Sequence, residues 1–310
     1  MKNYRISLSV IVVHLGSDNL IINFLKSLYQ SNLPFIFETI IIDNKSNSTD
    51  LSSIVNEYKN CKIIQLDNRM GYSAASNKGI LEAKGEFILW CNNDLIFEYN
   101  SIIELYTFLI KNSNYGIASP CLLNEDKSLQ PCYSLYNLNL FSIIFQLTGF
   151  KNKNSIKSFD ISVAPGACCM IRKNSLEQIG NVLDNSYFMY CEEFDLSFKF
   201  IKNNFKIRYI GSSNVIHLGG KTTKKTSINF LIQSLKSKFK YLYNNKNNVE
   251  AILFYFYLLF KFFLKSIFFL SISFFSLKFK EAYFLNKKLF LVLLRKDFFQ
   301  ADNLIIYYND

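Results

Sequence analysis

The chain has 310 residues, of which 50% are hydrophobic, 16% aromatic and 19% charged, so it is neither intrinsically disordered nor a disulfide-stabilised miniprotein, and one or two domains are expected. Its net charge of +11 indicates anionic partners such as phosphates, nucleic acid or an acidic lipid surface. The seven cysteines include no Cys-x-x-Cys pair and are typical of reduced thiols in a cytosolic chain, not of a disulfide framework or a zinc site.

Short β-rich runs alternate with helical patterns in the first part of the chain. Residues 7–13 predict a first strand and not a signal peptide, because the apolar run is short and no small-residue cleavage site follows it. Leu20, Phe24 and Leu28 then recur at helical spacing. Further strands are predicted at 39–42, 62–65 and 87–91, and further helices at 50–58, 73–84 and 101–111. This alternation predicts an α/β fold in which crossover helices join parallel strands and ligands bind at the strands' carboxyl ends.

Two carboxylates fall at that edge, since Asp43 ends the second predicted strand and Asp94 closely follows the fourth. Two other nucleotide-binding loops are disfavoured. The first strand-to-helix turn, residues 14–18, has one glycine, whereas a dinucleotide-binding turn needs three. Gly220-Lys221-Thr222 is like the end of a phosphate loop, but the first glycine of that loop would fall at Val215.

The composition changes at Gly220. All 11 glycines and all 4 prolines lie at or before this residue, so long helices are predicted after it. Between Lys221 and Lys280 there are 11 lysines and one acid, Glu250, which places nearly all of the net charge in this part. We therefore expect two domains, 1–220 and 221–310.

Seven separated segments of the first domain carry a further signal through their order along the chain. They are Ser9-Val-Ile-Val-Val13, Ile40-Ile-Ile-Asp-Asn44, Asn68-Arg-Met-Gly71 through Asn77-Lys-Gly79, Gly85-Glu-Phe-Ile-Leu-Trp-Cys-Asn-Asn-Asp94, Pro165-Gly-Ala-Cys-Cys-Met-Ile-Arg172, Tyr187-Phe-Met-Tyr-Cys-Glu-Glu-Phe-Asp-Leu196 and Val215-Ile-His-Leu-Gly-Gly220. In this order they resemble family 2 glycosyltransferases with the GT-A fold, over roughly residues 6 to 221. The closest subgroup looks like bacterial rhamnosyltransferases that act on surface polysaccharides.

The resemblance implies a nucleotide-diphosphate sugar donor whose leaving charge is neutralised by Mg²⁺ or Mn²⁺. It implies Asp94 as a metal ligand and His217 as the histidine that closes on the metal or the diphosphate. Asn92 and Asn93 depart from the family's fuller Asp-x-Asp pattern, which predicts a metal held weakly until the donor phosphates complete its shell. A helix cap for Asp94 and an ordinary surface or core position for His217 remain the alternatives.

The resemblance also implies a donor pocket. Asp43 would hydrogen-bond the pyrimidine base. Asn68, Gly71 and Asn77 would shape the nucleotide pocket, and ordinary turn and cap roles are the alternatives for these three residues. At the end of the first strand, where relatives often carry threonine or asparagine, this chain has His14. Gly166 and Ala167 would border the donor sugar.

The transfer implied is an inverting displacement, in which a carboxylate takes the proton of the attacking acceptor hydroxyl. Glu193 occupies the motif position of this base. The family usually has Glu-Asp here, whereas this chain has Glu192-Glu193, one methylene longer at the base. Three acids within four residues, Glu192, Glu193 and Asp195, should favour protonation of one of them, opposed by any helix N-terminus. A solvated, charged helix face is the alternative.

Residues 251–277 contain 18 Ile, Leu or Phe residues, interrupted by Lys261 and Lys265. The two lysines stand four apart on one helical face, so we favour an amphipathic helix lying in an anionic membrane surface over a spanning helix. A buried dimerisation face is the soluble alternative, which the lysine surplus disfavours. No nucleic-acid motif is present and the lysines stand among Phe and Leu, so no nucleic-acid partner is expected.

Together these features predict an inverting, metal-dependent glycosyltransferase, peripheral on the cytoplasmic face of the inner membrane. It would move a sugar, rhamnose from dTDP-rhamnose in the favoured version, onto a lipid-linked or surface-polysaccharide glycan. A noncatalytic sugar-nucleotide-binding or membrane scaffold of the same fold is the alternative, because Asn92, Asn93 and Glu193 depart from the family pattern.

Overall fold

A computed structural model describes residues 6–295 and 298, apart from 32, 47–50, 132, 136, 145–156, 181 and 220–227. In this part of the chain the strands form one mixed sheet in the order β3-β2-β1-β4-β8-β6-β9-β5, with β7 beside β9. The bounds are β1 (Leu8–His14), β2 (Phe37–Asp43), β3 (Cys61–Gln65), β4 (Phe87–Asn92), β5 (Leu95–Phe97), β6 (Tyr115–Leu123), β7 (Phe159–Asp160), β8 (Cys168–Arg172) and β9 (Lys206–His217).

The predicted parallel arrangement is confirmed for β1 to β4, which pair in parallel register. Beyond β4 the sheet is mixed, because β8 is antiparallel to both β4 and β6, and β5 is antiparallel to β9. The physical reason lies in where the chain enters β8. Its first residue, Cys168, pairs with Cys91 near the carboxyl end of β4, so the chain enters β8 at the ligand edge and runs back along β4.

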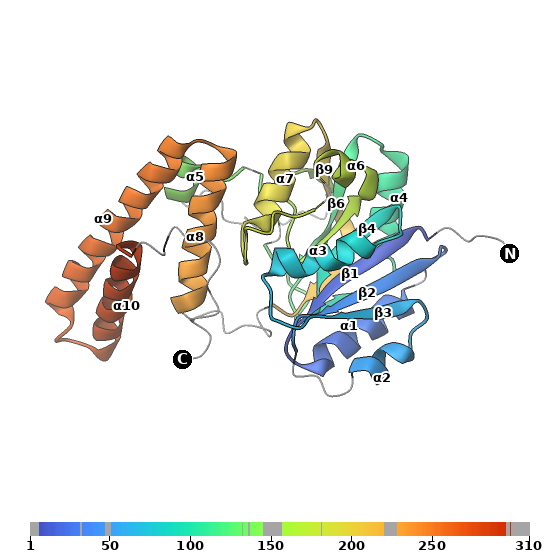
Figure 1. The fold of residues 1–310 in the computed structure, drawn as a ribbon, viewed down its shortest axis with the longest axis horizontal. Helices are drawn as coiled ribbons and strands as arrows, with labels where there is room; N and C mark the ends of the chain where they lie inside the picture. Colours follow the sequence, from blue (N-terminus) through green and yellow to red (C-terminus); the bar gives the residue numbers. More distant parts are fainter. Residues whose placement is uncertain are drawn as a thin grey trace.

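Helices pack on the sheet as the sequence pattern requires (Figure 1). Ser17 begins α1, because its hydroxyl accepts a hydrogen bond from the Asn19 amide, and α1 buries Phe24, Leu25 and Leu28. The predicted helices at 19–30, 50–58, 73–84 and 101–111 correspond to the first four in chain order. The bounds are α1 (Asp18–Gln30), α2 (Leu51–Asn56), α3 (Tyr72–Glu82), α4 (Ser101–Lys111), α5 (Leu140–Ile144), α6 (Lys173–Gln178) and α7 (Glu192–Lys202).

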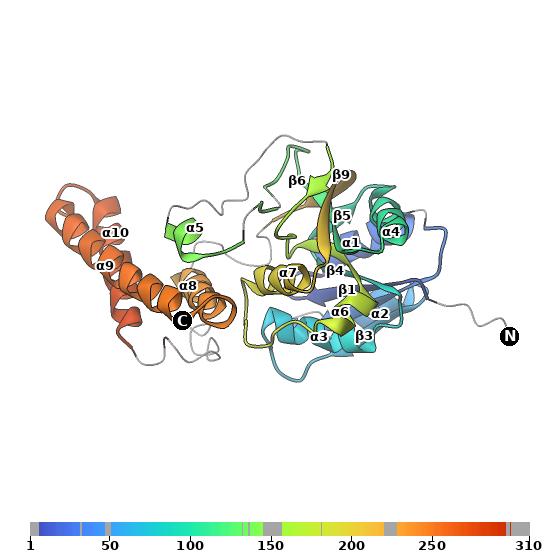
Figure 2. The ribbon, with the colours of Figure 1, turned by 90° about the horizontal axis from the view of Figure 1, so that it is seen from above.

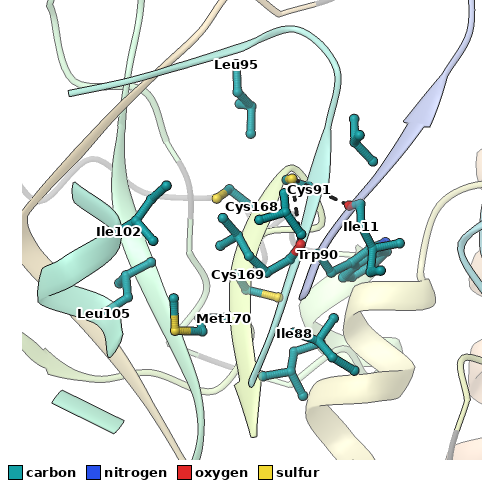
Figure 3. Packing of buried hydrophobic residues seen from close by; sticks show 14 of the residues in the cluster. Ile11, Ile88, Trp90, Cys91, Leu95, Ile102, Leu105, Cys168, Cys169 and Met170 are labelled. Carbon is teal, nitrogen blue, oxygen red and sulfur yellow. Dashed lines mark hydrogen bonds between the residues drawn. The ribbon is translucent and has the colours of Figure 1, made fainter. Parts of the chain in front are cut away.

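The core under the ligand edge is built on β4 and β8 (Figure 3). Trp90 is fully buried, and its indole N–H donates to the Ser76 hydroxyl of α3 at 3.0 Å. Cys168 and Cys169 lie buried opposite Cys91 and Trp90, as small apolar residues of the core. Burial raises the pKa of the Cys169 thiol, so it stays neutral. This packing fixes the end of β4, from which Asn92 to Asp94 continue.

The chain after the first domain forms three long helices, α8 (Ile228–Asn245), α9 (Asn248–Ile272) and α10 (Leu277–Leu293). They have a hydrophobic cluster of their own, and Figures 1 and 2 show them beside α7, with the α9–α10 hairpin farthest from the sheet. Among the described helices α9 is long and apolar enough to cross a membrane. Its most apolar 18-residue stretch has a mean hydropathy of 1.8, and 17% of that stretch is buried. The tip between α9 and α10 exposes Phe274 and Phe275 by 89% and 81%.

Candidate active site

A cavity of about 450 Å³ opens where β1 and β4 end. Five predicted site residues line it, namely Asp94, Gly166, Ala167, Glu193 and His217. The other lining residues are Val13, Leu15, Asn44, Arg69, Met70, Tyr72, Asn92, Asn93, Leu122, Gln130, Pro131, Pro165, Phe188, Met189, Tyr190 and Glu192. Segments far apart in the sequence, from Val13 to His217, therefore contribute to one cavity.

Asp94 and His217 meet because β5 and β9 pair antiparallel, with Leu95 opposite His217. The Asp94 carbonyl also accepts from the Leu218 amide at 2.9 Å, which closes the end of this strand pair. His217 Nε2 lies 3.3 Å from Asp94 Oδ1. The Asp94 carboxylate is only 3% exposed, and its Oδ1 has no hydrogen-bond donor among the described residues.

The His217 tautomer is set by Gln130, a residue that the sequence motifs did not identify. His217 Nδ1 lies 2.6 Å from Gln130 Oε1, and Gln130 Nε2 donates to Asn124 Oδ1 at 3.0 Å. Because Nε2 of the amide is the donor, Oε1 must accept, so His217 carries its proton on Nδ1. Nε2 is therefore the ring nitrogen that faces Asp94, and it is the nitrogen available to a metal.

These groups fit a divalent cation. A buried carboxylate oxygen without a donor and an imidazole nitrogen oriented through its other nitrogen are the ligands that Mg²⁺ and Mn²⁺ sites use. The described residues contain no cluster of three or more His, Cys, Asp or Glu side chains that suits a metal, and this pair offers two protein ligands. Two protein ligands leave most coordination positions to ligand oxygens, which agrees with a metal that binds together with a diphosphate.

Glu192 and Glu193 begin α7, directly after two residues with left-handed backbone, Tyr190 at φ 71° and Cys191 at φ 67°. Glu193 is partly buried against the cavity, and burial raises its pKa to about 7, opposed by backbone N–H groups at the start of the helix and by Lys238. Glu192 is buried, and burial together with the neighbouring Glu193 charge raises its pKa well above the usual range. Both carboxyl groups are therefore harder to ionise than an exposed glutamate, and their protons are lost as those of an interacting pair.

The acids of α7 do not form a solvated face. Asp195 is 2% exposed and accepts from Lys199 Nζ at 2.7 Å and from Asn245 Nδ2 at 2.8 Å. Gly166 lies against the Glu193 side chain, since a Cβ at position 166 would lie 3.4 Å from the Glu193 Cβ. The Glu193 side chain is thus confined between the loop before β8 and the start of α7.

Four predicted nucleotide-pocket residues do not line the cavity. Asp43 is buried at the end of β2, where its Oδ1 accepts from the Ser46 amide at 2.8 Å, and Asn68 is exposed. Asn44, which the motifs did not assign, does line the cavity. Its Nδ2 donates to the Met70 carbonyl at 2.9 Å, and its Oδ1 accepts from the Met70 amide at 2.8 Å.

Gly71 and Asn77 bear on the cavity through the loop before α7. A Cβ on Gly71 would lie 2.8 Å from the Phe188 backbone, and the next amide donates to the Phe188 carbonyl at 2.6 Å. Asn77 accepts from the Leu183 amide at 2.9 Å and donates to the Leu183 carbonyl at 2.8 Å. Both residues therefore hold the segment from which Phe188, Met189 and Tyr190 enter the cavity.

Asn92 and Asn93 have defined partners that use their amide groups. Asn92 Oδ1 accepts from the Tyr72 hydroxyl at 2.7 Å, and Asn93 Nδ2 lies 3.0 Å from Nδ1 of the buried His14. Burial lowers the pKa of His14, so its ring is neutral and Nδ1 can accept from Asn93. An ionised aspartate at position 93 would have no N–H to give.

Comparison with known proteins bears on what this cavity does. Residues 9–180 match the family described as Glycosyl transferase family 2. The chain is 32% identical over 215 residues to the low-salt glycan biosynthesis hexosyltransferase Agl10 of Haloferax volcanii, covering 68% of this chain and 66% of that protein. It is 24% identical over 247 residues to the rhamnosyltransferase WbbL of Escherichia coli strain K12, covering 75% and 91%. It is 22% identical over 226 residues to the N-acetylglucosaminyl-diphospho-decaprenol L-rhamnosyltransferase of Mycobacterium tuberculosis, covering 66% and 73%.

Two solved structures share the fold. GalNAc-T7 with UDP, GalNAc and Mn²⁺ has a TM-score of 0.55 at 16% identity, covering 68% of this chain and 43% of that chain. The mannosyltransferase PcManGT of Pyrobaculum calidifontis, with GDP-Man and Mn²⁺, has a TM-score of 0.55 at 15% identity, covering 80% and 67%. The expected α/β GT-A fold is confirmed.

Proposed function

The chain belongs to glycosyl transferase family 2, and from this premise we propose that it moves a single sugar from a nucleoside-diphosphate donor to a lipid-linked glycan acceptor. The observation that carries the proposal is that Glu193 shares one cavity with the Asp94–His217 pair. Displacement at an anomeric carbon needs a proton acceptor for the incoming hydroxyl and compensation of the leaving group's charge. The cavity holds residues for both.

Asp94 Oδ1 and His217 Nε2 would hold Mg²⁺ or Mn²⁺, which supplies positive charge to the departing diphosphate when it is bound. Gln130 accepts from His217 Nδ1 and so orients the ring with Nε2 toward Asp94. Three contacts hold the end of β4. The Asn92 side chain accepts from the Tyr72 hydroxyl, and the Asn93 side chain contacts His14. The Asn92 amide donates to the Ala167 carbonyl at 2.9 Å.

Glu193 is the proposed base. With a pKa of about 7, a large share of its carboxyl groups is ionised at neutral pH, and the proton affinity is high enough for it to take the acceptor's hydroxyl proton. The acceptor oxygen then bonds to the anomeric carbon while the bond to the diphosphate oxygen breaks, with inversion. Glu192 keeps its proton more tightly and limits the charge that the site must carry.

The sugar and the acceptor follow from the similar proteins. Two of them carry rhamnosyltransferase in their names, and one of these names a diphospho-decaprenol acceptor. We therefore propose dTDP-rhamnose as the first donor to test, and a polyprenyl-diphosphate glycan of surface polysaccharide synthesis as the acceptor class. Hexose donors come next, because Agl10 is a hexosyltransferase.

The helical extension supports membrane association, and we propose a peripheral position on the cytoplasmic face of the inner membrane. Large apolar side chains are exposed along α9 and α10, including Phe256, Phe260 and Phe268, while Lys261 lies over the Tyr257 ring. Exposed aromatic side chains among lysines suit an anionic bilayer surface, where the rings enter the acyl boundary and the ammonium groups reach the headgroups. We propose that 221–310 is the membrane-associating domain and 1–220 the GT-A domain.

The direct test measures diphosphate release from a panel of nucleotide sugars by the full chain in liposomes, with Mn²⁺ and with a chelator. We expect release from one donor with metal and none without it. Glu193→Gln should abolish transfer while the donor still binds, and Glu57→Gln, which changes an exposed glutamate, should act as wild type. Metal-independent binding of a nucleotide sugar without any release would instead support the noncatalytic scaffold.

A further inference from the structure

The loop before α7 is in close contact with α8, the first helix of the extension. Residues 186–191 lead into Glu192 and Glu193, and three of them, Phe188, Met189 and Tyr190, line the cavity. Figures 1 and 2 show α8 lying beside α7 in both views. The helix that begins the lysine-rich part of the chain therefore touches the segment that carries the proposed base.

The loop has a backbone that needs external support. Tyr190 and Cys191 are consecutive non-glycine residues in the left-handed region, at φ 71° and 67°. Such a conformation persists only where the surroundings determine it. It sets the direction in which α7 starts, and so the direction from which Glu193 enters the cavity.

Polar side chains of α8 supply that support. The Ser237 hydroxyl donates to the Met189 carbonyl at 2.7 Å, and Gln233 Nε2 donates to the Ser237 oxygen at 3.0 Å. Ser237 and Gln233 are 2% and 3% exposed, so these bonds are made away from solvent. Three residues further along α8 from Ser237, Lys240 Nζ donates to the Ser186 carbonyl at 2.9 Å.

Apolar packing and charge continue the contact. Tyr241 of α8 is fully buried in a cluster with Tyr187, Cys191 and Phe194. Asn245 at the end of α8 donates to Asp195 of α7 at 2.8 Å. Lys238 stands close enough to Glu193 for its charge to favour the ionised carboxyl.

We infer that Ser237 and Gln233 of α8 are positioning residues for Glu193, which act by holding the Met189 carbonyl and the left-handed turn after it. The inference rests on the proposed function for the role of Glu193. It assigns to the extension a second task beside membrane association, since α8 completes the acceptor side of the active site while α9 and α10 present the exposed apolar surface.

The first test uses hydrogen exchange and needs no activity. In full-length Ser237→Ala, amides of residues 187–193 should exchange several-fold faster than in wild type. Ser266→Ala is the matched control, because Ser266 bonds only within α9, to the Phe262 carbonyl at 2.7 Å, and its exchange at 187–193 should equal wild type. Unchanged exchange in Ser237→Ala overturns the inference, whether or not a donor is ever found.

The second test uses turnover. We expect Ser237→Ala to lower kcat about tenfold or more with the KM for donor within about twofold, because a small misplacement of the base acts on the chemical step. Ser237→Thr, which keeps the hydroxyl, should recover most of the rate. A kcat equal to that of Ser266→Ala would refute a positioning role, and a wild-type protein that releases no diphosphate from any donor would refute the proposed function and leave the exchange result standing.

The third test uses pH. The charged and titratable groups near Glu193 include Glu192 and Cys191 on its own segment, Cys169 on β8 and Lys238 on α8. The same cavity is lined by Arg69, Tyr72, Asp94 and His217 as well. Lys238→Gln removes a cation that favours the ionised carboxylate, so the acidic limb of kcat/KM should move to higher pH. Lys26→Gln, at an exposed position on α1, should leave it in place, and an unmoved limb in Lys238→Gln would count against the contact between α8 and the base.

Discussion

Removing the amide that holds His217 should weaken metal binding. In Gln130→Leu the His217 Nδ1 proton loses an acceptor that lies 2.6 Å away, in a part of the site where the ring is 16% exposed. A largely buried N–H without a partner costs about 1–3 kcal/mol. The ring also loses the interaction that orients Nε2 toward Asp94, so we expect Mn²⁺ affinity to fall about 10- to 100-fold.

The assay is a calorimetric titration of Mn²⁺ into the full chain at saturating nucleoside diphosphate, because the two protein ligands alone form an incomplete shell. Gln130→Glu keeps an oxygen acceptor and should bind Mn²⁺ within a few-fold of wild type or more tightly. Gln178→Leu, at an exposed position on α6, should match wild type. If Gln130→Leu binds Mn²⁺ as tightly as wild type does, then either His217 is not a ligand or its orientation does not depend on Gln130.

Three further predictions follow from other parts of the structure. Glu193 must be ionised to act, and its pKa is raised to about 7. The value of kcat/KM should therefore rise with pH through 7 and fall about tenfold for each pH unit below about 6. A flat profile from pH 5 to 8 would exclude Glu193 as the base. Replacing both Phe274 and Phe275 with serine should reduce flotation with anionic liposomes several-fold, whereas a double serine variant of two exposed apolar residues of the first domain should float as wild type does. Gly71→Ala places a Cβ 2.8 Å from the Phe188 backbone, so urea unfolding should show a loss of about 1–3 kcal/mol, and an unchanged midpoint would mean that the loop yields freely.

Local patterns were sufficient for the parallel part of the sheet and its first four helices. The apolar runs predicted β1, β2 and β4, which are buried over nearly their whole length, and the spacing of Leu20, Phe24 and Leu28 predicted α1. The absence of glycine and proline after Gly220 likewise predicted long helices, and the described residues form α8, α9 and α10 there. The reversal of β8 was not predicted, because strand direction depends on where a loop enters the sheet and not on the strand's own residues.

The candidate site was predicted where motif order places residues at strand ends, as for Asp94 and His217. Gln130 was not found, because it stands alone in the chain and meets His217 only through tertiary structure, 87 residues away. Asn77 and Gly71 were expected in the nucleotide pocket, yet their described contacts are with the loop before α7. A polar residue at a conspicuous spacing can serve the backbone of a distant loop, and only the folded chain distinguishes this from contact with a ligand.

The two edges of the sheet bear on how the protein behaves at high concentration. β3 has five residues and β5 three, and Lys62 on β3 reaches across to Glu82 at 3.2 Å. Short edge strands are poor templates for pairing with another chain, and the charge of Lys62 makes β3 poorer still. In the absence of lipid, self-association should therefore involve the exposed apolar side chains of the α9–α10 hairpin and not the edges of the sheet. A mild detergent that covers these side chains should then keep the purified protein monodisperse.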